Sequence, residues 1–201
     1  MSICTDLYNA ILKEEEINSS SLNPTLISVL VDTLNHDIII NYYSMNMTIH
    51  PYWIELYYNI ENNKNLQDPF CDKDDLKKSN NKLYFKSVKS ATWNRNRMDI
   101  CLGNGNNYIS ILIKRATIDS NPSMLTDSAI ANTVLNFCNM DVSKLTYSFS
   151  GNKYNKNIEF TRRVNIYNKN KIDIIKEKFA NKLYAVYDTD KIIYTTKIID
   201  D

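Results

Sequence analysis

Apolar residues recur at helical spacing in several stretches of the chain. The clearest stretch is 24–35, where Asn23 offers an N-cap, Pro24 takes the first helical position and the apolar stripe ends at Leu34. The same spacing predicts helices over 6–17, 126–137 and 172–181, and Thr126 is the expected N-cap of the third. Three or four helices are therefore expected.

Between these helices lie short runs of Ile, Val, Tyr and Phe, which are typical of β-strands. The runs cover 37–43, 45–49, 52–60, 83–85, 99–102, 108–113, 145–149, 158–160, 164–167, 184–187 and 192–199. The turn 103–107, rich in Asn and Gly, predicts a hairpin, His50-Pro51 predicts a bend or an edge, and the polar segment 61–81 predicts a long surface loop. This pattern predicts an α+β protein with a curved, mostly antiparallel sheet.

The length of 201 residues, with 43% hydrophobic residues, is enough for one substantial core. We expect a single domain over 1–201, with an N-terminal helix and linker over 1–22, a central unit over 24–166, and a C-terminal helix and strands over 167–201. The few glycines and abundant Asn, Lys and Ile are typical of an AT-rich genome, which weakens arguments from composition.

Charge and cysteine content exclude several classes of function. The 24 basic and 23 acidic residues nearly cancel, so binding to nucleic acid would need a local basic patch. The four cysteines are far apart and there are only two histidines, so neither a metal site nor a cofactor is expected. The start lacks a basic signal region, and no apolar run approaches the roughly 18 residues of a membrane span. We expect a soluble intracellular monomer, cytoplasmic or nuclear, without membrane contact.

Two carboxylates stand inside apolar strand patterns, Glu55 and Asp99. Aromatic residues lie near them in sequence, including Tyr57, Tyr84 and Trp93. A core-facing Glu55 would need hydrogen bonds or a cation to compensate for its burial, and such a carboxylate can act as a general base. Strict alternation equally allows Glu55 to point into solvent while Ile54 and Leu56 face the core, so both orientations stay open.

Seven motifs, in order, are similar to those of the alkyladenine (3-methyladenine) DNA glycosylases and their remote relatives, over roughly 24–166. They are Glu55-Leu56-Tyr57, Asp68-Pro69-Phe70-Cys71-Asp72, Leu83-Tyr84-Phe85, Met98-Asp99-Ile100, Ile111-Leu112-Ile113-Lys114, Asn121-Pro122-Ser123-Met124-Leu125 and Arg162-Arg163-Val164-Asn165-Ile166. The resemblance implies an enzyme of base-excision repair that flips a damaged purine out of double-stranded DNA and hydrolyses its N-glycosidic bond.

The resemblance also implies roles for individual residues. Glu55 would activate the attacking water, and Tyr57 would stack on the flipped base. The base pocket would be completed by Tyr84, Asp99 and Asp72. Contacts to nucleic acid would come from Lys86, Lys89, Trp93, Arg95, Arg97, Lys114 and Arg163, with Trp93 filling the gap in the duplex.

The chain departs from the family pattern at several of these positions. Asp72 stands where the family has His, Lys86 where relatives have His or Tyr, and Lys114 where they have Arg. With Asp72 beside Glu55 and Asp99, the expected base pocket would hold three acids, and their charges would repel a phosphate. Two further interpretations are therefore kept: a module that binds a nucleobase, a free purine nucleotide or nucleic acid without cleaving it, and an unrelated α+β interaction protein with an exposed Glu55.

Overall fold

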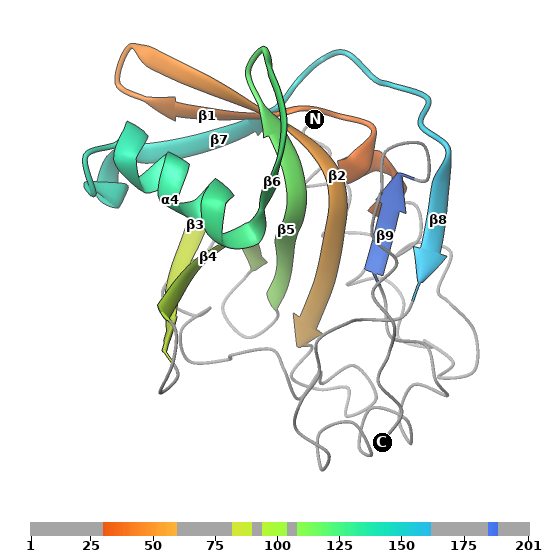
Figure 1. Ribbon diagram of the computed structural model, residues 1–201, viewed down its shortest axis with the longest axis horizontal. Coiled ribbons are helices and arrows are strands. Elements are labelled where there is room, and N and C mark those ends of the chain that lie inside the picture. The colour runs from red at the N-terminus through yellow and green to blue at the C-terminus, as the bar shows by residue number, and fades with distance from the viewer. Residues whose placement is uncertain (1–29, 60–81, 90–93, 104–107, 162–184, 189–201) are drawn as a thin grey trace.

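The protein folds around one antiparallel sheet that curls into a half-barrel, as the computed structural model shows (Figure 1). The structure describes residues 30–59, 82–89, 94–103, 108–161 and 185–188. The α+β class and the curved antiparallel sheet are confirmed. The helices predicted over 6–17 and 172–181, the strands over 164–167 and 192–199 and the loop 61–81 lie outside the described residues. Among the described residues, no helix is long and apolar enough to cross a membrane.

Six strands form the main path of the sheet, in the order β3, β4, β5, β2, β1, β7. Their bounds are β1 Ile38–Tyr42, β2 Met45–Asn59, β3 Leu83–Lys89, β4 Asn94–Gly103, β5 Tyr108–Ile118 and β7 Leu145–Phe149. β6, Asn121–Thr126, pairs with β5, while β9, Ala185–Asp188, pairs with both β2 and β8, Ile158–Thr161. The predicted hairpin between β4 and β5 is confirmed, with Gly103 opposite Tyr108.

The long strand β2 runs through the position where the sequence predicts a bend. Residues 45–49 of β2 pair with β1, and residues 49–59 pair with β5. The register against β5 shifts between Pro51 and Trp53 and again between Trp53 and Ile54. Pro51 has no backbone N–H to donate to a ladder, and such irregularities bend a strand and increase its twist. The predicted runs 45–49 and 52–60 are thus one strand, bent near Pro51.

One helix covers one face of the sheet. It is α4, Asp127–Phe137, and Thr126 is its N-cap, as predicted, because its hydroxyl accepts a hydrogen bond from the backbone N–H of Ala129. Ile130 and Val134 are buried, as the apolar spacing predicts. A second helical segment covers 30–34, which agrees with the predicted end of the helix over 24–35.

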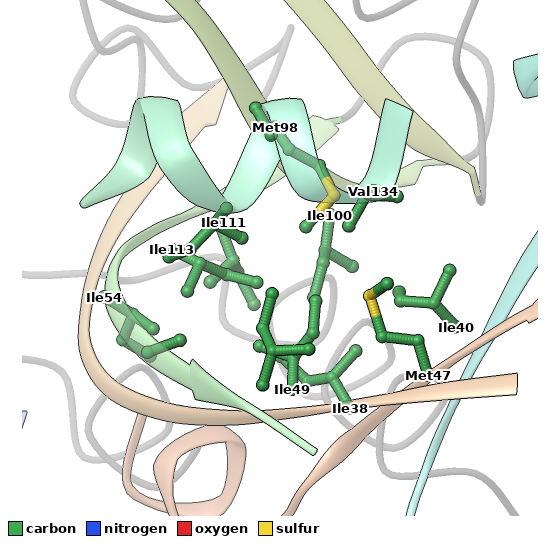
Figure 2. Close-up of a cluster of buried hydrophobic side chains, with 14 of the residues drawn as sticks. Ile38, Ile40, Met47, Ile49, Ile54, Met98, Ile100, Ile111, Ile113 and Val134 are labelled. Carbon is green, nitrogen blue, oxygen red and sulfur yellow. The ribbon is translucent and has the colours of Figure 1, made fainter. Parts of the chain in front are cut away.

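The main core lies between α4 and the sheet (Figure 2). Alternate residues of neighbouring strands supply it, including Ile54, Ile100, Ile111 and Ile113, and Val134 comes from the helix. All five side chains are at most 1% exposed. Because side chains alternate across a strand, the residues between them must point to the opposite face of the sheet.

Hydrogen bonds between polar side chains connect residues 150–156 with the segment that precedes β1. Asp37 accepts a hydrogen bond from Tyr154 at 2.8 Å and lies 2.7 Å from His50 Nδ1. The bond to Asp37 raises the pKa of Tyr154. Lys156 donates to the Pro51 carbonyl at 2.8 Å, so this segment also crosses the bend of β2.

Candidate active site

The predicted site residues lie side by side on the face of the sheet opposite the main core. Glu55 is paired with Leu112, Leu112 with Asp99, and Asp99 with Tyr84, which makes one row across four strands. In the next row, Tyr57 is paired with Ser110. Residues in one row, or two apart along a strand, point to the same face. The sheet thereby brings together four residues that the sequence singled out: Glu55, Tyr57, Tyr84 and Asp99.

Glu55 is buried, and its two carboxylate oxygens differ in their surroundings. The side chain is 1% exposed, so of the two orientations that the sequence leaves open, the one that points into solvent is wrong. Both faces of β2 are covered here, because Ile54 and Leu56 are also fully buried. Oε2 accepts a hydrogen bond of 2.7 Å from the hydroxyl of Tyr57. Oε1 has no hydrogen-bond partner in the described part of the chain.

Lys114 lies between Glu55 and a third acid, Asp127. Its Nζ is 4.0 Å from Oε2 of Glu55 and 3.5 Å from Oδ2 of Asp127. Lys114, to which the resemblance assigns a contact with nucleic acid, therefore lies beside Glu55. Sequence reasoning missed Asp127, because an acid in the first turn of a helix is common and needs no further partner. Only the fold brings the start of α4 next to β5.

Arg97 and Asp99 form the closest ion pair of this face. Arg97 Nη2 donates to both oxygens of Asp99, at 2.9 and 3.1 Å, and its guanidinium carbon lies 5.2 Å from the centre of the Tyr57 ring. Burial raises the pKa of Asp99, while Arg97 and a hydrogen bond from Ser110 oppose the rise. For Arg97, burial alone would lower the pKa, but the charge of Asp99 raises it above its ordinary value.

The remaining predicted contacts to nucleic acid have different surroundings. Arg95 lies 3.6 Å from Asp127, so it is engaged with an acid of the same protein. Lys86 is half-buried in β3 and paired in register with Arg97. Asp72, Trp93, Arg163 and the side chain of Lys89 lie outside the described residues.

On or beside this face, ion pairs link three acids, Glu55, Asp99 and Asp127, with three cations, Arg95, Arg97 and Lys114. We call these six residues the charged cluster. Its formal charges cancel, and each acid has a cation within 4.0 Å. Net neutrality lowers the cost of burying charge, and the Oε1 of Glu55 is left able to accept a proton or a hydrogen bond. No group of three or more His, Cys, Asp or Glu among the described residues could hold a metal ion.

The chain was compared with protein families and with curated proteins. No protein-family model matches the chain, and no curated protein matches it.

Proposed function

We propose that the protein is a purine DNA glycosylase in which Glu55 activates the water that cleaves the N-glycosidic bond. One observation carries this proposal: a buried carboxylate has one oxygen fixed by Tyr57 and the other without a donor. A general base needs such an oxygen, because it must accept a proton from water while the carboxylate is held in place. Through this hydrogen bond, Tyr57 would hold the Glu55 side chain in one rotamer.

In the proposed reaction, Glu55 takes a proton from a water molecule bound at Oε1. The water oxygen forms a bond to C1′ of the flipped nucleotide, and the C1′–N bond breaks with its electron pair leaving on the purine. Arg97 already covers one face of the Tyr57 ring, so a purine stacked on Tyr57 would use the opposite face. Asp99 would lie beside the base, with its carboxylate held in place by Arg97.

The experiment that tests this proposal compares wild type with Glu55→Gln. Each would be incubated with DNA duplexes that contain one ethenoadenine, hypoxanthine or methylated purine, and free base would be measured. We expect release by the wild type and a loss of about 10²- to 10⁴-fold in Glu55→Gln, since the amide cannot take the proton.

The matched control is Glu159→Gln, the same substitution at an exposed strand position of β8. It should leave base release unchanged. Equal activity of Glu55→Gln and wild type would contradict the role of Glu55, and no release by the wild type from any of these duplexes would contradict the proposed reaction.

A second candidate function is binding of a nucleobase or purine nucleotide without cleavage. It is supported by the pairing within the charged cluster. Arg95, Arg97 and Lys114 are each engaged with an acid of the same chain, so a phosphodiester backbone would gain less from them than from unpaired cations. Tight binding of free purine nucleotide by both wild type and Glu55→Gln, without release of base from DNA, would favour this second function.

A further inference from the structure

Asp127 has its orientation fixed by the helix that it begins. One oxygen, Oδ1, accepts a hydrogen bond of 2.8 Å from the backbone N–H of Ser128. The other, Oδ2, lies 3.5 Å from Lys114 Nζ and 3.6 Å from Arg95. The start of α4 also favours a negative charge at this position through the helix dipole. Asp127 is therefore a fixed anion that points at the lysine of the charged cluster.

Lys114 has two acids within reach, and it is bonded to only one of them. Lys114 Nζ donates a long hydrogen bond of 3.5 Å to Oδ2 of Asp127, whereas it lies 4.0 Å from Oε2 of Glu55. The side chain of Lys114 is 6% exposed, so solvent offers its ammonium little compensation. If Asp127 lost its charge, Glu55 would be the nearest acid for this buried cation.

A lysine bonded directly to Glu55 would weaken it as a base. The ammonium would occupy a lone pair of the carboxylate, which would then no longer be open to the proton of the attacking water. We propose that Asp127 is a positioning residue that holds Lys114 away from Glu55 and keeps Glu55 able to accept a proton. This role rests on the proposed function of Glu55.

The first test is structural and needs no substrate. Asp127→Asn keeps the shape of the side chain and an oxygen that can accept from Ser128, but removes the charge. We expect a crystal structure of the variant to show Lys114 Nζ at about 3 Å from a carboxylate oxygen of Glu55. A separation that stays at the present 4.0 Å would overturn the proposal.

The second test asks whether Asp127 acts through Lys114. On a duplex with one ethenoadenine, Asp127→Asn should lower the single-turnover rate of base release by about tenfold or more. In a Lys114→Met background, the same substitution should change the rate by less than about twofold, because the residue through which it acts is gone. An equal loss in both backgrounds would overturn the proposal.

Two comparisons make these results interpretable. Asp141→Asn removes the same charge from the acid that caps the short 3-10 helix Val142–Lys144, away from the charged cluster. This substitution should leave the rate of base release unchanged. Thermal unfolding reports whether each variant folds. The double variant, Asp127→Asn with Lys114→Met, removes both members of a buried ion pair, and proteins tolerate this better than the loss of one member. If the wild type released no base, the proposed function would fail, whereas the structural test would still decide whether Asp127 holds Lys114.

Discussion

At the scale of single residues, the site depends on which oxygen or nitrogen has a partner. Glu55 is as buried as the isoleucines beside it, yet one of its oxygens is held by Tyr57 and the other has no donor among the described residues. Asp99, in the same row, has both oxygens bound by Arg97. Glu55 thus has an oxygen that can accept a further hydrogen bond or a proton, whereas both oxygens of Asp99 already accept from Arg97.

The pair of Arg97 and Asp99 leads to a prediction about stability and pH. Because burial raises the pKa of Asp99, the folded protein holds this proton more tightly than the unfolded chain does. The contribution of Asp99 to stability is full below its ordinary pKa of 3.8 and is lost as the pH rises through its folded pKa. Arg97→Met removes the cation that opposes the rise in the pKa of Asp99. The stability that is lost as Asp99 ionises should therefore be larger in the variant, and the loss should extend to higher pH.

We expect Arg97→Met to lower the free energy of unfolding by about 3 to 5 kcal/mol at pH 7, and by clearly less near pH 4, where Asp99 is more often neutral. Urea unfolding of the variant and wild type at both pH values measures the difference. A matched control is Arg97→Met with Asp99→Asn, which should recover much of the loss at pH 7. The same loss for Arg97→Met at both pH values would show that the charge of Asp99 is not the cause.

At the scale of elements, α4 connects the core to the charged cluster. Its buried face, with Ile130 and Val134, packs on the sheet, and its first residue is Asp127. The N-cap Thr126 fixes where the helix begins, and therefore where the carboxylate of Asp127 points. A cap that looks purely structural in the sequence is thus one residue away from the cluster.

Thr126→Ala removes the hydroxyl that accepts from the N–H of Ala129. We expect the free energy of unfolding to fall by about 1 kcal/mol, within a range of roughly 0.5 to 2, because the backbone N–H of Ala129 at the helix start loses its acceptor. Urea denaturation measures this change. Thr126→Ser keeps the hydroxyl and should cost clearly less, so an equal loss in both variants would mean that the cap contributes little.

At the scale of the whole molecule, the two faces of one curled sheet have different chemistry. The face under α4 is filled by aliphatic side chains, whereas the opposite face carries the charged cluster and a small apolar group around Leu112 and Cys101. The apolar face supplies the driving force for folding. The acids and cations of the charged cluster come together only when the strands are paired and α4 is in place.

Ile100, on β4, is a fully buried member of the apolar core beneath α4 (Figure 2). Ile100→Ala should lower the free energy of unfolding by about 2 to 5 kcal/mol, because it removes buried methyl groups and leaves a cavity. Met140→Ala, at a side chain that is 65% exposed, should change it by less than about 0.5 kcal/mol. Chemical denaturation followed by far-UV circular dichroism compares the two, and a similar small effect in both would contradict the assignment of the core.

Much of the candidate site could be found from the sequence, and part of it could not. Glu55, Tyr57, Tyr84, Asp99 and Lys114 were singled out and lie together on one face. Asp127 was not, because it is 13 residues from Lys114 and 72 from Glu55, and nothing in a local pattern connects them. The pairing of Arg97 with Asp99 was also missed, although alternation places residues two apart on the same face.

The sequence by itself determined the elements: the end of the first described helix, the N-cap at Thr126, the hairpin between β4 and β5, and the bend near Pro51. These features depend on residues a few positions apart, so their signals are local. The tertiary structure alone decided that β2 is one continuous strand, that Glu55 is buried with one oxygen bound, and that Lys114 is shared by two acids. The physical reason is that burial and charge pairing depend on neighbours across strands, and those neighbours are set only when the sheet forms.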